Sequence, residues 1–330
     1  KYGARAFQYD LTEGFLPLRE ALVEYLSAKG ILSTVDGILV SSGSQSVLDG
    51  LGKILVSPGD RVAVEAPTYL GALQAFAPYE PSYVQIETDE QGVLPEALEA
   101  AISKQPVKFV YLVPNFQNPT GRTLSMQRRV AIADILQRFN ALLVEDDPYG
   151  DLRYQGSPLV PIKGLAPNHV VYISTLSKVL APGLRMGFCL APPMIHRWLV
   201  LAKQGVDLHT STFNQALAAE YLSGGHLARH LPRIIALYRP RRQAMLDAMQ
   251  RFFPSGFHWA KPDGGMFVWA QGPVGMDMQS VNRKAIARNT AFVPGTFFFV
   301  RPGDGRETLR LNFTMADEST LFRALGILGE

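Results

Sequence analysis

Short runs of consecutive apolar residues alternate with longer amphipathic stretches between Ile38 and Ala191. Uninterrupted apolar runs are typical of strands in a sheet that helices cover on both faces. We predict seven strands, at Ile38–Ser41, Arg61–Glu65, Tyr83–Glu87, Phe109–Val113, Ala141–Glu145, Val170–Ser174 and Arg185–Leu190. Four helices are predicted between them, at Gln45–Leu55, Leu70–Phe76, Pro95–Ser103 and Ser125–Phe139. This alternation favours the α/β class, with a doubly wound, mainly parallel seven-stranded sheet.

The pattern changes after about Leu237. One predicted helix, Arg241–Phe253, precedes four short strands at Phe257–Trp259, Gly265–Trp269, Ala291–Pro294 and Thr308–Phe313, with glycine- and proline-rich turns among them. This part indicates a smaller C-terminal α+β domain. We therefore expect a large domain at 1–236 and a small domain at 237–330, packed closely and bridged by the helical stretch Asn214–Tyr238.

Composition narrows the function classes. The chain has 330 residues, of which 47% are hydrophobic and 18% charged, an ordinary balance for a soluble globular protein. The net charge of +3 comes without a long basic run, so we expect no nucleic-acid partner. Cys189 is the single cysteine and the six histidines lack ligand spacing, so we expect neither a disulfide nor a metal site.

We also expect a cytoplasmic protein without a membrane partner, because no signal peptide is visible and no apolar run approaches the roughly 18 residues that a span needs. The first residue is Lys1 rather than Met, so we expect that some N-terminal sequence precedes it.

Ligands of a doubly wound sheet bind where its strands end, so the residues directly after each run are the candidates. Ser41–Gln45 ends one strand and opens a helix. Gly43 permits a tight turn there, and the N–H groups at the helix start, with Ser44 and Gln45, face an anion. An ordinary serine cap is the alternative. The chain carries neither a dinucleotide-binding glycine fingerprint nor a P-loop.

Lys178 follows another strand, in Ser174-Thr175-Leu176-Ser177-Lys178, and Arg185 comes seven residues later. A lysine amine can condense with an aldehyde, while the hydroxyls of Thr175 and Ser177 and the Arg185 guanidinium can hold a phosphate. A ligand with both groups is pyridoxal phosphate. A solvated surface lysine is the alternative.

Three further segments suit the ring of the same cofactor. Tyr69 can stack on it, and Asn118, in Asn118-Pro119-Thr120-Gly121, can hydrogen-bond its phenolate oxygen; a core tyrosine and a plain turn are the alternatives. The segment Glu145-Asp146-Asp147-Pro148-Tyr149 offers a carboxylate for the pyridine nitrogen. Because side chains alternate along a strand, we choose Asp146 for that role and expect Tyr149 at the ring oxygen. A magnesium site is the alternative for the three carboxylates.

Arg310 lies between leucines in Thr308–Phe313, where an unpaired guanidinium is costly. Bidentate pairing makes arginine well suited to the α-carboxylate of an amino acid. A structural salt bridge explains it equally well.

Taken together, these motifs resemble those of fold-type I pyridoxal phosphate enzymes of the class I/II aminotransferase group, in the α-aminoadipate and kynurenine aminotransferase branch. The resemblance runs from about Phe7 to Asp317. It rests on Gly43–Gln45, Glu65–Tyr69, Phe116–Gly121, Glu145–Tyr149, Ser177–Arg185 and Gly264–Trp269, all in the family's order.

The resemblance implies a role for each candidate. Lys178 bonds to the cofactor aldehyde and then shuttles a proton, while Asp146 pairs with the ring nitrogen. Asn118 and Tyr149 contact the ring oxygen and tune the pKa of the lysine linkage, and Arg310 binds the substrate carboxylate beside Phe267. Tyr69 stacks on the ring, and the phosphate is held by Ser44, Gln45, Thr175, Ser177, Arg185 and Tyr9, the last from the partner subunit of a homodimer. Family members also carry a segment before Phe7 that closes over the substrate, of which almost none is present here.

The expected reaction moves an amino group from an L-amino acid, of 2-aminoadipate, aromatic or aliphatic type, to a 2-oxo acid such as 2-oxoglutarate. Two alternatives remain open. One is an aminotransferase-like effector domain of a transcription regulator that binds pyridoxal phosphate. The other is a different fold-type I enzyme, such as a lyase, racemase or decarboxylase.

Overall fold

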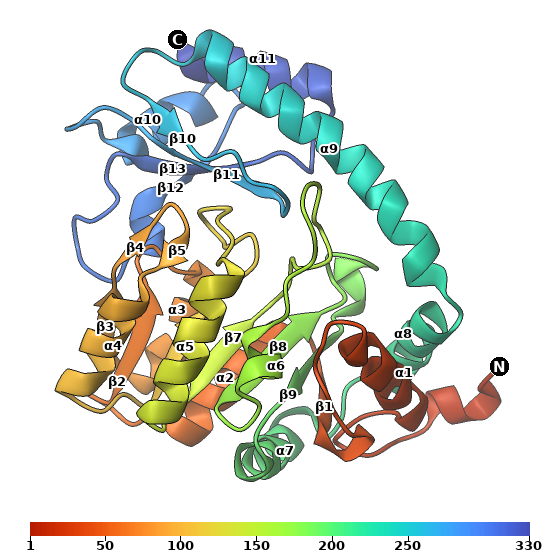
Figure 1. The fold of residues 1–330 in the computed structure, drawn as a ribbon. Helices are drawn as coiled ribbons and strands as arrows, with labels where there is room; N and C mark the ends of the chain where they lie inside the picture. The colour runs from red at the N-terminus through yellow and green to blue at the C-terminus, as the bar shows by residue number, and fades with distance from the viewer.

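Two sheets, of seven and four strands, organise the chain and are linked by one long helix (Figure 1). The computed structural model describes residues 1–330. The large sheet lies in the lower part of Figure 1 and the small sheet above it.

The large sheet has the strand order β1-β9-β8-β7-β6-β2-β3. Its strands are β1 (Ile38–Ser41), β2 (Arg61–Glu65), β3 (Ser82–Ile86), β6 (Phe109–Leu112), β7 (Leu143–Asp146), β8 (Val170–Thr175) and β9 (Gly187–Leu190). Only β9 runs antiparallel to its neighbours β8 and β1. The predicted doubly wound, mainly parallel seven-stranded sheet is confirmed, with shifts of one or two residues at several strand ends.

Apolar residues at alternate positions of the central strands β2, β6 and β7 belong to two different cores. Val62 and Val64 of β2 belong to the core that α2 (Ser44–Leu55) and α7 (Pro193–Asp207) cover. Ala63 between them belongs to the core under α4 (Pro95–Lys104), α5 (Met126–Arg138) and α6 (Ile162–Leu165). Both faces are thus buried, which is why the strands read as uninterrupted apolar runs.

The small sheet has the order β10-β11-β13-β12, all antiparallel. Its strands are β10 (His258–Trp259), β11 (Phe267–Gln271), β12 (Val293–Pro294) and β13 (Thr308–Asn312), and it packs with α10 (Met278–Ile286) and α11 (Glu318–Gly329) around a third core. The remaining elements are α1 (Leu16–Ser27), α3 (Leu70–Phe76), α8 (Thr212–Ser223) and the two-residue strands β4 (Thr88–Asp89) and β5 (Gly92–Val93).

The linking helix α9 spans His226–Phe252 as one element. We predicted a helical stretch Asn214–Tyr238 and a separate helix Arg241–Phe253, and the break between them was wrong: Pro232 and Pro240, which normally interrupt a helix, both lie inside α9. In Figure 1, α9 runs along one side of the molecule from α8 to α11. The predicted division between 236 and 237 falls inside this helix and stays a prediction.

None of the helices is both long enough and apolar enough to cross a bilayer.

Candidate active site

A cavity of about 120 Å³ opens where the strands of the large sheet end. Strands β1, β2, β6, β7 and β8 all run the same way, so the segments that follow them meet at one edge. Arg185 precedes the antiparallel β9 and therefore starts at this same edge. The cavity is lined by Ser44, Gln45, Tyr69, Val113, Asn118, Asp146, Pro148, Tyr149, Thr175, Ser177, Lys178, Pro182 and Arg185. Of the predicted site residues, only Tyr9, Arg310 and Phe267 are not in its lining.

One end of the cavity is built for an anion. Helix α2 begins at Ser44, directly after Gly43. The φ of Gly43 is 89°, a value that glycine adopts readily and other residues rarely do. A Cβ added to Gly43 would lie 2.5 Å from Nη2 of Arg185. The guanidinium therefore lies almost against the backbone at the helix start, and cationic and N–H donors converge on one point.

Hydroxyl groups from the segment after β8 complete this end. Oγ1 of the buried Thr175 lies 2.9 Å from Oγ of Ser177, and the backbone N–H of Ser177 donates to it at 3.1 Å. Gln45 lines the cavity too, but its amide Nε2 donates to the carbonyl of Gly71 at 2.6 Å. Since an amide nitrogen carries two N–H donors, the second N–H of Gln45 remains available to a phosphate.

Lys178 is half-buried, and its amine makes no hydrogen bond or ion pair within the chain. Burial lowers the pKa of Lys178, and the positive charges of Arg185 and Arg310 lower this pKa further. A lower pKa leaves more of the amine in its neutral, nucleophilic form.

Asp146 is 2% exposed and faces the cavity. Its Oδ2 accepts a hydrogen bond of 2.8 Å from the hydroxyl of Tyr111, while its Oδ1 is buried without any partner. Burial raises the pKa of Asp146 to about 7. A buried carboxylate oxygen without a donor is costly, and a protonated ring nitrogen is the kind of donor it needs.

The two neighbouring carboxylates point elsewhere, as strand alternation requires. Glu145 accepts from the backbone N–H groups of Ile162 and Lys163 at 2.9 and 2.7 Å on the α6 side. Asp147 accepts from the hydroxyl of Tyr172 at 2.8 Å. Our sequence analysis missed Tyr111; the signal was a tyrosine inside an apolar strand, whose hydroxyl needs a buried partner.

Two aromatic side chains border the cavity. A Cβ on Gly71 would lie 2.4 Å from Cζ of Tyr69, so only a glycine leaves room for this ring in its present position. Tyr149 is buried and packs edge-on against Phe267, with 5.9 Å between ring centroids. Burial raises the pKa of Tyr149, which keeps its hydroxyl protonated and able to donate.

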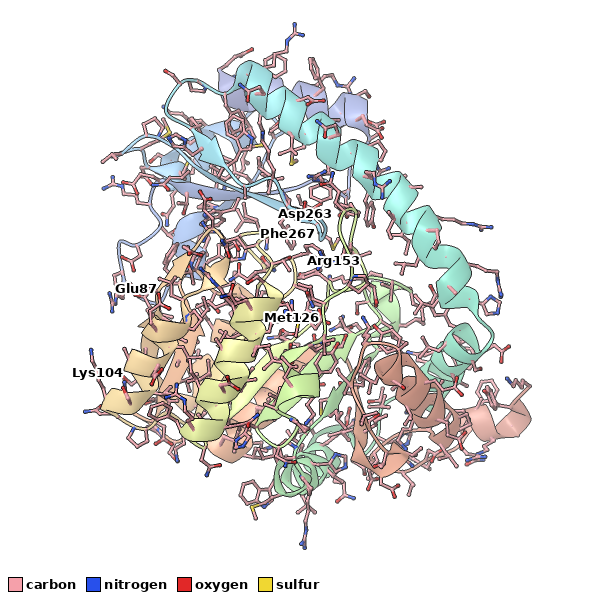
Figure 2. The ribbon with its side chains drawn as sticks, in the orientation of Figure 1. Glu87, Lys104, Met126, Arg153, Asp263 and Phe267 are labelled. Atoms are coloured by element: carbon pink, nitrogen blue, oxygen red, sulfur yellow. The ribbon has the colours of Figure 1, made fainter.

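Arg310 of β13 reaches the site from the small sheet. Its Nη1 donates a hydrogen bond of 2.7 Å to Oδ1 of Asn118. The guanidinium carbon lies 4.2 Å from the ring centroid of Phe267 and 5.1 Å from that of Phe298. Figure 2 shows Phe267 on the small-sheet side, at the boundary with the large sheet. None of the ion pairs in the structure includes Arg310, so its charge has no carboxylate partner of its own.

Tyr9 lies outside the cavity on the surface. It is 81% exposed and touches the ring of His209 edge-on at 5.5 Å between centroids. Within one chain, therefore, the structure does not bring Tyr9 to the other candidates.

The residues present fit pyridoxal phosphate. The anion end matches its phosphate, the unpartnered Asp146 oxygen matches its ring nitrogen, and the amine of Lys178 lines the same cavity.

Comparison with known proteins identifies the family. The model of the family "Aminotransferase class I and II" matches residues 3–327. The chain belongs to this family. It is 46% identical to aromatic-amino-acid aminotransferase 1 of Thermococcus litoralis, over 100% of this chain and 81% of the relative. It is 38% identical to 2-aminoadipate transaminase of Thermus thermophilus, over 99% of this chain and 82% of the relative.

Among solved structures, the kynurenine aminotransferase of Pyrococcus horikoshii superimposes on this aminotransferase with a TM-score of 0.96. The two are 44% identical, and the match covers 100% of this chain and 83% of that one. The predicted enzyme class and its aminoadipate and kynurenine branch are confirmed. The regulator alternative is not favoured, because an HTH-type transcriptional regulator of Bacillus subtilis is only 31% identical, over 98% of this chain and 67% of the relative.

Proposed function

We propose that this aminotransferase moves the amino group of an L-amino acid to a 2-oxo acid such as 2-oxoglutarate, with the chemistry centred on Lys178. The observation that carries the proposal is one cavity lined by the Lys178 amine, the anion-binding end of α2 and the unpartnered carboxylate oxygen of Asp146.

The cofactor is pyridoxal phosphate, which supplies an electron-poor ring that accepts the electron pair released at the substrate Cα. Ser44, Thr175, Ser177 and Arg185 hold its phosphate, with Gln45 beside them. Asp146 keeps the ring nitrogen protonated, and Tyr111 holds that carboxylate in place. Tyr69 covers one face of the ring, and Asn118 and Tyr149 donate to its oxygen.

Lys178 then acts as the general acid and base. With pyridoxal phosphate bound, the Lys178 amine would take the proton from the substrate Cα and hold it for return. A positioned group of this kind contributes about 10²–10⁴-fold to such a transfer. The lowered pKa of Lys178 favours the neutral amine that accepts the proton.

Arg310 binds the α-carboxylate common to the donor and the acceptor, with Phe267 beneath it. Support comes from its guanidinium, which has no acidic partner and lies over an aromatic ring. The donor belongs to the 2-aminoadipate, aromatic or aliphatic class, as the names of the relatives from Thermococcus litoralis and Thermus thermophilus suggest.

The enzyme works as a homodimer in which Tyr9 of each subunit completes the phosphate site of the other. Support comes from the exposed apolar surface around Tyr9, where Phe7 and Phe213 stack at 5.5 Å and are 76% and 45% exposed. We assign the protein to the cytoplasm, consistent with its one buried, unpaired cysteine, Cys189.

The test is a half-reaction followed by visible absorbance. Protein loaded with pyridoxal phosphate should be yellow, and each good donor should convert the cofactor stoichiometrically to pyridoxamine phosphate. Lys178→Ala should hold the cofactor without the covalent bond and should not complete this conversion. Conversion at the wild-type rate by Lys178→Ala would contradict the assignment, and release of CO₂ or racemised donor would point to another fold-type I reaction.

A further inference from the structure

Arg129, in α5, has the bulkiest of the fully buried side chains, with 0% of its surface exposed. None of the ion pairs in the structure includes it. Instead, its guanidinium donates to three carbonyl oxygens and one side-chain amide. An apolar residue of similar volume would avoid the cost of burying this charge, so packing alone does not account for an arginine here.

Two of these bonds, to the carbonyls of Pro114 and Leu124, hold the loop that carries Asn118. Nη2 of Arg129 donates to the carbonyl of Pro114 at 3.1 Å, and Nε donates to the carbonyl of Leu124 at 3.0 Å. Pro114 and Leu124 are the two ends of this loop, and the N–H of Leu124 also donates to the Pro114 carbonyl at 2.8 Å. One rigid guanidinium therefore closes the loop at its base.

Another bond leads to the loop that carries Tyr149. Nη2 of Arg129 donates to Oδ1 of Asn115 at 2.6 Å, and Nδ2 of Asn115 donates to Oδ1 of Asp147 at 2.9 Å. The same Asp147 oxygen accepts the backbone N–H of Gly150 at 3.0 Å, which closes the turn around Tyr149. Both ends of the Asn115 amide are thus committed, and the chain Arg129–Asn115–Asp147 is continuous.

We infer that Arg129 is a positioning residue that sets the separation of Asn118 and Tyr149 through Pro114, Leu124 and the Asn115–Asp147 chain. This inference rests on the proposed function, in which both side chains donate to the cofactor's ring oxygen. Donors aimed at a shared oxygen act only within a few tenths of an ångström, and a misplacement of about 1 Å can lower a rate by about 10²-fold. The Arg129 guanidinium thus fixes the distance between Asn118 and Tyr149, although it touches neither substrate nor cofactor.

Two variants break the chain at different points. Arg129→Met removes the guanidinium, whereas Asn115→Leu keeps it and removes only the relay to Asp147. Arg129→Lys keeps the charge but has a single donor point, which cannot reach both ends of the loop. Arg128→Met is the matched control, because Arg128 is adjacent in α5 and equally engaged, with Asp89 and the carbonyl of Gly92, but it touches neither loop.

The decisive readout is the visible absorbance of cofactor-loaded protein titrated with pH, which reports the pKa of the Lys178–cofactor linkage. We expect Arg129→Met and Asn115→Leu to shift this pKa by about one unit or more. We also expect kcat to fall about 10-fold to 100-fold with little change in KM for the amino donor. Arg129→Lys should lie in between, and Arg128→Met should match the wild type.

Other results would overturn the inference. If Arg129→Met and Asn115→Leu only lowered the melting temperature, with linkage pKa and kcat per loaded site equal to those of Arg128→Met, Arg129 would be a structural residue. If Arg129→Met does not fold, the inference is tested by comparing the linkage pKa and kcat of Asn115→Leu with those of Arg128→Met. A wild-type protein that stays colourless with pyridoxal phosphate would instead contradict the proposed function itself.

Discussion

Arg310 of the small sheet donates a hydrogen bond of 2.7 Å to Oδ1 of Asn118 in the loop after β6 of the large sheet. The bond joins the residue proposed to hold the substrate to a residue proposed to contact the cofactor. It also fixes the Asn118 amide, because an oxygen that accepts from Arg310 leaves the Nδ2 donor on the other side. An arriving substrate carboxylate would compete with Asn118 for the same guanidinium.

Replacing Arg310 by lysine should weaken substrate binding more than cofactor binding. A single ammonium cannot pair with a carboxylate through two parallel bonds or lie flat between Phe267 and Phe298. We expect kcat/KM to fall about 10²-fold for both the amino donor and the oxo acceptor, since both carry the carboxylate. Arg301→Lys, an exposed arginine in the same part of the chain, serves as the control. A loss confined to one of the two substrates would exclude the assigned role.

Asp146→Asn should slow the half-reaction without removing the cofactor. The amide keeps the size of the carboxylate but not the charge that holds the ring nitrogen protonated, so we expect a loss of about 10²–10⁴-fold in rate. Tyr111→Phe removes the only hydrogen bond that the Asp146 carboxylate accepts within the chain, which should lower the rate about tenfold. Stopped-flow absorbance measures both rates. Tyr83→Phe, a tyrosine of the same sheet remote from the cavity, is the control, and equal rates for all three variants would refute the pairing.

Much of this site was predictable because it depends on local rules. Alternation along β7 selected Asp146 from three consecutive carboxylates, and the parallel strand order gathered the loops at one edge. Arg129 was not predictable in this way, since its acceptors at Pro114, Leu124 and Val160 come from loops that only the tertiary fold brings together. The length of α9 was missed for a related reason: packing against α8 and α11 outweighs the local cost of Pro232 and Pro240.

Gly43→Ala should weaken cofactor binding although it removes no functional group. Its Cβ would meet Nη2 of Arg185 at 2.5 Å and push that guanidinium away from the start of α2. Gly59→Ala is a close control, because Gly59 has a similar φ of +83° but nothing within 4 Å of an added Cβ. Both variants should lose about 1–3 kcal/mol of stability, because a residue with a Cβ is strained at a positive φ. Only Gly43→Ala should also bind pyridoxal phosphate about tenfold more weakly, measured by titration of the absorbance; equal affinities would argue against a phosphate at this position.

Glu65 should make the apoprotein less stable as the pH rises. Burial raises the pKa of Glu65 from its ordinary 4.5 to about 8. The folded protein therefore holds this proton more tightly than the unfolded chain does. The resulting stabilisation is fully present below pH 4.5 and is lost as the pH rises through about 8.

Glu65→Gln, which stays neutral and can still accept from the N–H of Val113, should abolish this dependence. Compared with the wild type, the variant should gain stability steadily across that pH window, to about 5 kcal/mol at its upper end. Melting temperatures of the two apoproteins at matched pH values test this. The exposed Glu87→Gln should behave like the wild type, and a constant difference between Glu65→Gln and wild type at all pH values would rule out titration of Glu65.

Tyr9 provides the sharpest test of a shared site, because it is 81% exposed and outside the cavity of its own chain. We expect Tyr9→Ala to lose activity at low cofactor concentration and Lys178→Ala to be inactive. A mixed dimer of these two chains has one site with both residues intact, if Tyr9 acts across the interface. Random assembly should then restore about a quarter of wild-type activity, since half of the dimers are mixed and half of their sites are complete. The reciprocal dimer, in which one chain carries both substitutions and the other is wild type, should have no fully active site. Activity in that reciprocal dimer, with none restored in the first, would place Tyr9 in the site of its own subunit.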